Sequence, residues 1–286
     1  MSAALVVGAT GTTGSRVVAG LVAAGVRVRA ASRRAVAVQG AGMGAEVEAV
    51  RFDWGDPGSY GEVLGGGVDR VYLVPPPGTA DPAAVMLPFL RRARAEGVRR
   101  AVLLSSSAIP SGGPAVGRVH AALPGIFDEW AVLRPSWFMQ NFTGDHLHAR
   151  TARTEGVIRT ATGEGRVGFV DAEDIAAVAV RALVDERAPN ADLVITGPRA
   201  LSYGDVAAVL TEVTGRTVVH QRLTREEMAE RLAAEMPAAF AGMLADMDRA
   251  IAGGAEDRTA GTVERITGRP PHDFRTVAER EAGGRG

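Results

Sequence analysis

Short apolar runs alternate with longer amphipathic stretches along the first two thirds of the chain. Each apolar run has the length of one buried β-strand, and the stretches between them repeat their apolar residues at helical spacing. The predicted strands are 3–7, 27–31, 47–52, 68–74, 101–105, 130–133 and 192–196. Helices are predicted to begin at Thr13, at Ala83 and near Ile175, and Gly25 and Gly97 end the first two.

This alternation of strand, helix and strand is typical of parallel βαβ units. Parallel crossovers are right-handed in nearly all proteins, so the simplest architecture is an α/β fold with a Rossmann-type, doubly wound parallel sheet. We predict that residues 1–134 form this dinucleotide-binding domain, completed by later segments near 157–196. Residues 135–286 then form mostly a smaller, mainly helical substrate-binding lobe.

Beyond about residue 197 the pattern is mostly helical, with apolar residues at three- and four-residue steps. Two interpretations are open. In the first, these apolar residues form a stripe that packs in the core between helices. In the second, part of this methionine-rich stripe lines an apolar substrate cleft, because methionine adapts to irregular shapes. The residues concerned are Met228, Leu232, Met236, Phe240, Met243, Leu244, Met247 and Ile251.

Three glycines, Gly8, Gly11 and Gly14, lie between the first predicted strand and the first predicted helix, in the sequence GATGTTG. Here the first glycine permits a tight turn, the second lets backbone approach a ligand, and the third lets helix and strand pack closely. The helix N-terminus then offers free amides to a pyrophosphate. The motif predicts dinucleotide binding, and a tight turn without a ligand is the alternative. The contacts are assigned to Gly8, Thr10, Gly11, Thr12, Thr13 and Gly14.

The end of the second predicted strand indicates which dinucleotide binds. NAD-binding proteins usually carry a carboxylate there, for the ribose 2′-hydroxyl. This chain has Ser32 and Arg33 instead, and an arginine pairs with a 2′-phosphate. The two residues favour NADP(H) as the cofactor. The alternative is that the arginines only begin a solvated helix.

Residues after the third and fourth predicted strands complete the cofactor site. Asp53 and Trp54 are assigned to the adenine ring, because a carboxylate accepts from the adenine amino group; an Asx turn at Asp53 is the alternative. The turn Val74-Pro75-Pro76 is predicted to run under the central ribose and phosphates, with Val74 and Pro75 assigned as contacts.

Composition narrows the class of protein. A formal net charge of −1 argues against an electrostatic grip on nucleic acid or anionic lipid. The chain has no cysteine, which excludes disulfides, thiolate metal sites and a cysteine nucleophile. No apolar run has the length of a membrane helix. We therefore expect a cytoplasmic protein that binds a small molecule, not nucleic acid or a membrane; the sequence does not indicate its oligomeric state.

No metal site is predicted. His146 and His148 are two positions apart, and on a helix such side chains diverge by about 200°. Asp171 and Asp174 stand at the start of the helix predicted near Ile175. We interpret them as structural, the first as an N-cap and the second as a first-turn carboxylate favoured by the helix dipole.

The usual proton donor of short-chain reductases is absent. The spacing Gly-x-x-Gly-x-x-Gly resembles that of extended and atypical short-chain dehydrogenases/reductases, and many short-chain enzymes use a Tyr-x-x-x-Lys pair as the acid. This chain has no lysine, and its only tyrosines are Tyr60, Tyr72 and Tyr203. A hydride acceptor must then be electrophilic already, as an iminium ion, a quinone or an enone is, or another group or water must supply the proton.

Residues 118–142, RVHAALPGIFDEWAVLRPSWFMQNF, carry a more specific resemblance. They are similar to the NmrA-like branch of atypical short-chain dehydrogenases/reductases, which includes festuclavine/agroclavine dehydrogenases and NmrA-like NADPH:quinone reductases. The segments 169–176 and 267–271 add to it. The resemblance implies that Pro135, Trp137 and Phe138 border the nicotinamide end of the cleft, and Trp137, Phe138 and Asn141 are assigned to the substrate. The two aromatic side chains could stack on a flat substrate or on the nicotinamide ring, and ordinary core packing is the alternative for each.

Three further residues are assigned near the nicotinamide. Ser105 and Ser106 occupy the place of the serine that orients substrate in related enzymes, so Ser105 is assigned to the cofactor and Ser106 to the substrate; a polar loop is the alternative. His120 is the candidate catalytic acid, because its unperturbed pKa is about 6.5. The chain departs here from the quinone reductases, which carry a lysine shortly before the sixth strand where this sequence reads His120-Ala121-Ala122. A structural or surface role for His120 is the alternative.

These assignments predict an NADPH-dependent oxidoreductase that reduces a small apolar acceptor: an imine or iminium ion, an enone or a quinone. Two alternatives stay open. One is a non-catalytic, NADP(H)-sensing regulatory protein of NmrA type. The other is an isomerase or epimerase that retains its cofactor.

Overall fold

The computed structural model describes residues 2–35, 47–79 and 81–283, which form two compact units. Unit 1 comprises Met1–Pro135, Ala172–Val194 and Arg265–Gly268, and unit 2 comprises Ser136–Asp171, Ile195–Glu264 and Arg269–Gly286. The chain returns to unit 1 at residue 172, later than the predicted 157. The cause is that β7 (Val157–Thr160) and β8 (Arg166–Val167) pair inside unit 2, with β11 (Val219–Arg222) and β10 (Leu201–Ser202).

Unit 1 is built on one sheet, whose seven strands within the described residues have the order β3-β2-β1-β4-β5-β6-β9. They are β1 (Ala3–Val7), β2 (Arg27–Ser32), β3 (Val47–Arg51), β4 (Val68–Leu73), β5 (Arg100–Leu104), β6 (Glu129–Pro135) and β9 (Ala191–Ile195). Neighbouring strands from β3 to β6 are parallel. The order reverses between β1 and β4, where doubly wound sheets bind ligands. The predicted fold class is confirmed.

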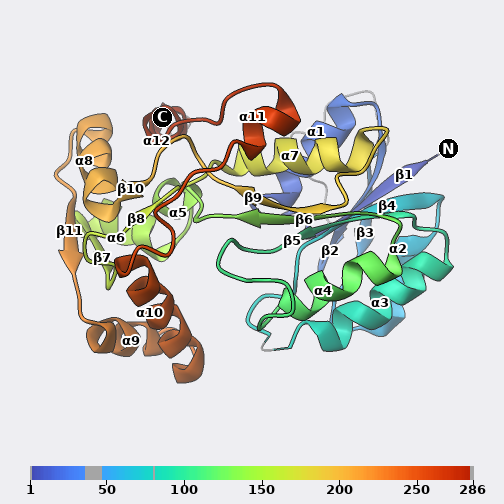
Figure 1. Cartoon of the computed structure of the whole chain (residues 1–286), viewed down its shortest axis with the longest axis horizontal. Coiled ribbons are helices and arrows are strands. Elements are labelled where there is room, and N and C mark those ends of the chain that lie inside the picture. The colour runs from blue at the N-terminus through green and yellow to red at the C-terminus, as the bar shows by residue number, and fades with distance from the viewer. Residues whose placement is uncertain (1, 36–46, 80, 284–286) are drawn as a thin grey trace. The chain divides into compact units, whose positions relative to one another are not determined.

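Helices cover both faces of this sheet (Figure 1). On one face α1 (Gly14–Ala23) packs against α7 (Ala172–Val184), and on the other α3 (Ala83–Ala95) packs against α4 (Gly117–Ile126). The short α2 (Tyr60–Leu64) lies on the α3 side. Phe52, Trp54, Tyr60 and Phe89 form an aromatic cluster in the core on this side, with ring centroids 4.8–6.4 Å apart.

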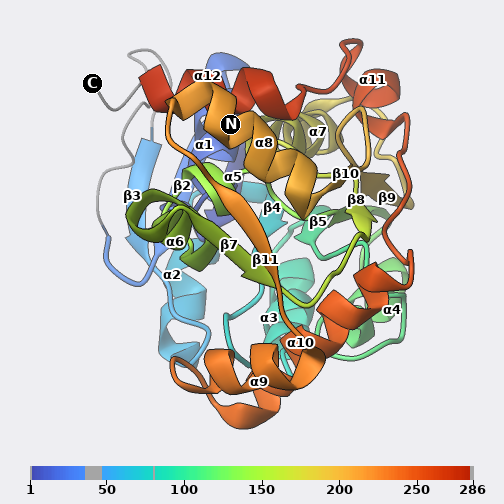
Figure 2. The ribbon, with the colours of Figure 1, turned by 90° about the vertical axis from the view of Figure 1, so that its left-hand side faces the viewer.

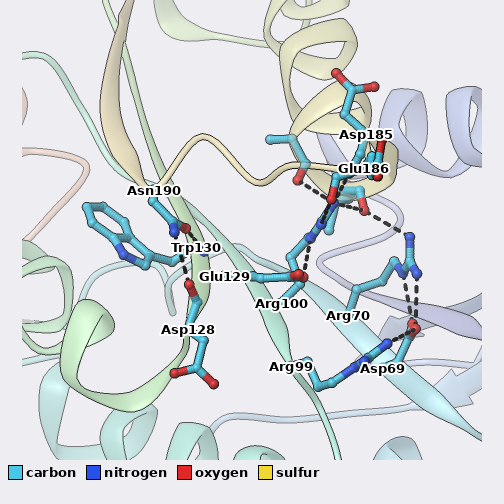
Figure 3. Close-up of polar contacts among 12 residues, drawn as sticks. Asp69, Arg70, Arg99, Arg100, Asp128, Glu129, Trp130, Asp185, Glu186 and Asn190 are labelled. Carbon is cyan, nitrogen blue, oxygen red and sulfur yellow. Dashed lines mark hydrogen bonds and ion pairs between the residues drawn. The ribbon is translucent and has the colours of Figure 1, made fainter.

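Two arginines near the amino ends of the strands hold the C-terminus of α7 (Figure 3). Arg100 is 6% exposed and donates to the carbonyl oxygens of Leu183 at 2.9 Å and Asp185 at 2.6 Å, and to the Glu129 carboxylate at 2.8 Å. Arg70 donates to the same Leu183 carbonyl at 2.9 Å. The last carbonyls of a helix have no intrahelical donor, so these guanidinium groups satisfy them. The network lies opposite the ligand-binding edge and therefore serves the fold.

Unit 2 is mainly helical, and Figure 2 shows β7 beside β11 and α9 against α10. Its helices include α5 (Gln140–Thr143), α6 (Leu147–Glu155), α8 (Tyr203–Thr214), α9 (Arg225–Ala233), α10 (Ala238–Ala252) and α12 (Phe274–Gly283), and α11 (Thr262–Thr267) contains a unit boundary. The rings of Phe142, Phe169, Tyr203 and Phe274 pack at its centre, with centroids 5.2–6.3 Å apart.

The methionine-rich stripe falls on α9 and α10, except for Met236, which lies in the turn between them. Met228, Leu232 and Ile251 are buried, which confirms the prediction of helix core for them. For Phe240 and Met243 that prediction is wrong, since they are 39% and 43% exposed. The other interpretation, an apolar substrate cleft, stays a prediction.

A buried carboxylate anchors α12 in unit 2. Asp171 is fully buried and accepts from both Nη atoms of Arg280 at 3.0 and 3.1 Å, and from Gln140 Nε2 at 2.8 Å. His272 Nδ1 lies 3.1 Å from the same carboxylate. These contacts give Asp171 a structural role. The prediction that Asp174 lies in the first turn of α7 is confirmed.

Within the described residues, no helix combines the length and the apolar character that a membrane span requires.

Candidate functional site

The glycine turn between β1 and α1 has the geometry that its sequence predicts. Gly8 has φ +75°, in the left-handed region that favours glycine. A Cβ added at Gly14 would lie 2.1 Å from the Gly8 carbonyl oxygen, so only glycine lets α1 begin this close to β1. A Cβ at Gly11 would meet only that oxygen, at 3.3 Å. The turn therefore leaves open space above Gly11, where a ligand could approach the backbone.

A pocket of about 540 Å³ opens beside this turn. It lies at the carboxyl ends of β1, β2, β3 and β4, the edge at which doubly wound sheets bind ligands. Its lining contains the predicted cofactor residues Gly8, Thr10, Gly11, Ser32, Arg33, Asp53, Trp54, Val74 and Pro75. It also contains Val7, Ala31, Phe52, Gly55, Pro76, Pro77, Thr79 and Val85.

The three threonines of the turn differ in orientation. Thr10 lines the pocket, and Thr12 is exposed beside it. Thr13 is buried, and its hydroxyl accepts from the phenol of Tyr72 at 3.0 Å. The side chain of Thr13 therefore faces the core. Of the residue's predicted contact with the dinucleotide, only a contact through its backbone amide stays a prediction. The first amides of a helix have no intrahelical acceptor.

At the adenine end of the pocket, the Asx turn at Asp53 is present. Asp53 Oδ1 accepts from the Gly55 amide at 2.9 Å. The turn uses one carboxylate oxygen, and the predicted adenine contact would use the other. Trp54 donates its indole N–H to the Val74 carbonyl at 3.0 Å. This bond fixes the indole of Trp54 as part of the pocket wall.

The predicted phosphate-selecting residues lie together at the end of β2. Arg33 is exposed and lines the pocket. The Ser32 hydroxyl donates to the carbonyl oxygen of Arg34, which closes the turn that carries Arg33. An exposed guanidinium keeps its hydration until a ligand arrives, so holding its charge there costs little.

The two tyrosines of unit 1 are buried, and their hydroxyls are hydrogen-bonded inside the core. Tyr72 donates to Thr13, as described, and Tyr60 donates to the Trp54 carbonyl at 2.9 Å. Burial raises the pKa of both phenols. Tyr203, in unit 2, is buried as well, and burial raises its pKa far above the ordinary value. Neither phenol of unit 1 is therefore placed to donate a proton in the pocket.

The turn that follows β5 continues the sheet. Ser105 donates its amide to the Leu133 carbonyl at 2.7 Å, and Ser107 donates to the Pro135 carbonyl at 2.9 Å. Within the described part of the chain, the Ser105 hydroxyl is buried without a hydrogen-bond partner. A buried hydroxyl in that state costs about 1–3 kcal/mol, which a ligand that bonds to it would recover.

His120, the candidate acid, lies on α4 and is 5% exposed. Burial lowers its pKa; nearby Asp192 opposes this and nearby Arg134 adds to it. The imidazole is therefore neutral at pH 7, and a neutral imidazole is a poor proton donor. The pocket lining, as far as the structure describes it, does not include His120. Its catalytic role stays a prediction that these surroundings disfavour.

Of the predicted substrate contacts, Ser106 lies in unit 1 and the other three lie in unit 2. Trp137, Phe138 and Asn141 are each half-buried. The Trp137 carbonyl accepts from the Val170 amide at 2.9 Å, and Phe138 forms a parallel bridge with Val170. Their contact with substrate stays a prediction, as does the role of buried Pro135 beside the nicotinamide.

The two spaced histidines differ from their prediction. His146 is the N-cap of α6, outside the helix, and its Nδ1 accepts from the His148 amide at 3.2 Å. The two rings therefore lie close, with centroids 4.9 Å apart, and do not diverge on one helix. The His148 ring stacks on Phe142, and burial lowers the pKa of His148 to about 3. The His148 imidazole is thus neutral at pH 7 and half-buried beside Phe142.

Sequence reasoning missed one wall of the pocket. Pro77 and Thr79 line it beyond the predicted turn 74–76, together with Val85 from α3. The signal was the length of the proline run after β4, of which only the first part was assigned to the cofactor. A run of prolines is also a rigid, extended segment with a fixed backbone angle.

Comparisons with known proteins agree with this geometry. Residues 8–125 match the family model described as NAD(P)H-binding. The chain is 42% identical to uncharacterized oxidoreductase YesF of Bacillus subtilis over 279 residues, which cover 97% of this chain and 94% of that protein. It is 42% identical to agroclavine dehydrogenase of Claviceps fusiformis over 233 residues, 78% of this chain and 80% of that one. An NADPH-dependent quinone oxidoreductase of Escherichia coli, solved with NADPH, shares the fold: 24% identity, TM-score 0.80, and 97% and 99% coverage.

Proposed function

This chain belongs to the family of NAD(P)H-binding oxidoreductases that includes the agroclavine dehydrogenases, and on that premise we propose that it transfers a hydride from NADPH to a small, largely apolar organic acceptor. The acceptor is an imine or iminium ion, an enone or a quinone. The family membership that the sequence motifs predict is therefore confirmed. The preference for NADPH and the class of acceptor are our proposals.

The observation that carries the proposal is the pocket at the glycine turn. Gly14 admits no side chain, and Gly11 leaves open space beside the N-terminus of α1. Free amides and the positive end of a helix dipole suit a pyrophosphate. The unpartnered hydroxyl of Ser105, found among the described residues, is a polar atom that a ribose or carboxamide would satisfy. These features fit a nicotinamide dinucleotide.

Arg33 supports the choice of NADPH over NADH. Its exposed guanidinium lines the pocket where the ribose 2′-position is expected. A charge-assisted pair with phosphate contributes about 1.5–3 kcal/mol, which corresponds to about 10–150-fold in Kd. Arg33→Asp should raise the Kd of NADPH by at least about 10-fold and change the Kd of NADH by less than threefold. Arg34→Asp, an equal charge change one residue away and outside the pocket lining, is the control. Equal losses for both cofactors would refute the assignment.

The surroundings of the pocket support an acceptor that is already electrophilic. The phenols of Tyr60 and Tyr72 are bonded inside the core, and the chain has no lysine. When bound, NADPH would supply one hydride, which carries the two electrons of the reduction. An iminium carbon that accepts it becomes a neutral amine and needs no proton. An imine, enone or quinone needs one proton as well, and water can provide it.

The test is consumption of NADPH by the purified chain with a panel of cyclic iminium ions, imines, enones and quinones. We expect turnover with at least one class, one equivalent of NADP⁺ for each acceptor reduced, and little turnover with simple ketones, which need an acid. NADPH binding without turnover on any acceptor would favour the cofactor-sensing alternative. A change of substrate without net loss of NADPH would favour the isomerase alternative.

A further inference from the structure

Arg134 joins two strands to the serine turn, which we define as Ser105–Ser107. Arg134 lies on β6, and its Nη1 donates to Asp192 Oδ2 on β9 at 2.6 Å. Its Nη2 donates to the carbonyl oxygen of Ser107 at 2.9 Å, and its Nε to that of Ser106 at 3.4 Å. One guanidinium therefore ties β9 to two successive carbonyls of the turn.

The position of Arg134 explains why an arginine is needed. Side chains two apart on a strand share a face, and Val132 packs in the core that α4 covers, so Arg134 points to the same face near the end of β6. Its side chain is 17% exposed. Carbonyls this close to the core need donors. A planar guanidinium reaches three acceptors in a fixed geometry, whereas a lysine ammonium is a point charge on a flexible stem.

The serine turn lies on the continuation of the cofactor pocket. Leu73 of β4 pairs with Leu103 of β5, so Pro75, which lines the pocket, stands level with Ser105 one strand away. The lining residues of β2 and β3 suit the adenosine half of the cofactor. The nicotinamide half must therefore extend across β4 toward the ends of β5 and β6. The serine turn stands at that end.

We propose that Arg134 is a positioning residue, oriented by Asp192, that fixes the serine turn where the nicotinamide and the acceptor meet. The inference rests on the proposed function. The amide of Ala108 donates to Ser106 Oγ at 3.3 Å, which leaves the hydroxyl hydrogen of Ser106 for another acceptor. Moving the turn by about 1 Å would misplace the hydroxyls of Ser105 and Ser106, and such a misplacement can cost about 100-fold in rate.

The experiment compares Arg134→Gln and Arg134→Lys with the wild-type chain, and uses Arg94→Gln as the matched control. Arg94 forms an ion pair of equal length, 2.6 Å, with Asp128 in unit 1, and Asp128 directly precedes the opposite, amino end of β6. Two readouts are measured with saturating NADPH: hydrogen exchange of the amides from Ser105 to Ile109, and kcat with the best acceptor. The Kd of NADPH is measured separately.

For both Arg134 variants we expect faster amide exchange in the turn by at least about tenfold, and kcat lower by about 10–100-fold, with a Kd for NADPH within threefold of wild type. Arg94→Gln should match wild type in all three. Unchanged exchange would show that Arg134 does not hold the turn. Faster exchange with unchanged kcat would show that the turn does not position the reaction. Equal losses in kcat and cofactor affinity would show a general structural role. Each of these results overturns the inference.

A second variant keeps the test decisive if the Arg134 variants do not fold. Asp192→Asn preserves the size of the side chain and removes its charge. We expect kcat to fall by about 3–10-fold with cofactor affinity retained, and an unchanged kcat would overturn the inference. A wild-type chain that reduces no acceptor is a different result: it refutes the proposed function, while the exchange measurement still reports whether Arg134 holds the turn.

Discussion

Substituting the third glycine of the turn tests how closely α1 must approach β1. A Cβ at position 14 would lie 2.1 Å from the Gly8 carbonyl oxygen, and real Cβ contacts stay beyond 3.0 Å. In Gly14→Ala the start of α1 must therefore move by about 0.9 Å or more. Overpacking of this kind destabilises proteins by about 1–3 kcal/mol. The same movement misaligns the amides that face the pyrophosphate, and each charge-assisted bond lost weakens binding by about 1.5–3 kcal/mol.

Gly11→Ala separates the two effects. Its Cβ would meet only the Gly8 carbonyl oxygen, at 3.3 Å, and a shift of a few tenths of an ångström relieves that contact, so the free protein should lose much less stability than Gly14→Ala. The added methyl group would occupy the space that a phosphate needs. The assays are thermal unfolding without ligand and calorimetric titration with NADPH. We expect Gly14→Ala to lower the Tm by several degrees and to weaken NADPH binding at least about tenfold. Gly11→Ala should weaken binding as strongly while lowering the Tm much less. The reasoning fails if Gly14→Ala melts and binds as the wild type does, or if Gly11→Ala binds NADPH normally.

Three predictions concern unit 2. Asp171→Asn should lower the free energy of unfolding by about 2–4 kcal/mol, because Arg280 loses the buried carboxylate with which it pairs. The control is Arg275→Gln, on the same helix as Arg280, which breaks an exposed ion pair with Glu212 and should lower it by less than about 1 kcal/mol. The pKa of His148 is about 3 in the folded protein against an ordinary 6.5. As the pH falls below 6.5, His148 is protonated in the unfolded chain but not in the folded one, so the folded state loses stability. His148→Phe should flatten this decline in a Tm–pH profile. Asp248 has a folded pKa of about 6 against 3.8, so it adds stability as the pH falls through that window, and Asp248→Asn should steepen the acid decline. Profiles that change in the opposite direction would contradict the assigned environments of these two groups.

The parts of the molecule that could be predicted from the sequence are those that local chemistry determines. The glycine turn needs only Gly8, Gly11 and Gly14 and the apolar run before them, and its backbone agrees with the prediction. The seven strands of the large sheet were predicted to within one or two residues at each end, because continuous apolar runs indicate buried parallel strands. Ser32, Arg33 and Asp53 follow such strands directly, and the carboxyl ends of parallel strands meet at one edge of the sheet.

The parts that could not be predicted depend on contacts between distant segments. Arg134 and Asp192 are 58 residues apart, and Asp171 and Arg280 are 109 apart. No spacing rule connects such pairs, because their meeting depends on how β9 and α12 return to their units. The short strands β7 and β11 likewise lack a strong local pattern until they pair.

A local error occurred at His146. It was placed on a helix with His148, but its ring nitrogen caps α6 from outside. Histidine is not among the usual N-cap residues, so the sequence offered no signal for this boundary. The burial of His120 was also invisible in the sequence, because it depends on the packing of α4 against β6.

The most direct test of the central claim is deuteride transfer from NADPH labelled at C4. The purified chain is incubated separately with each C4 diastereomer and with the imine and enone acceptors, whose carbon retains the label. We predict that one diastereomer alone delivers deuterium to the product, because a cofactor held in the glycine-turn pocket presents one face of its nicotinamide. Iminium ions are included in the same way, and with quinones the loss of deuterium from the cofactor is followed instead. Deuterium that stays on the cofactor with every one of these acceptors, or that leaves equally from both diastereomers, would contradict the account.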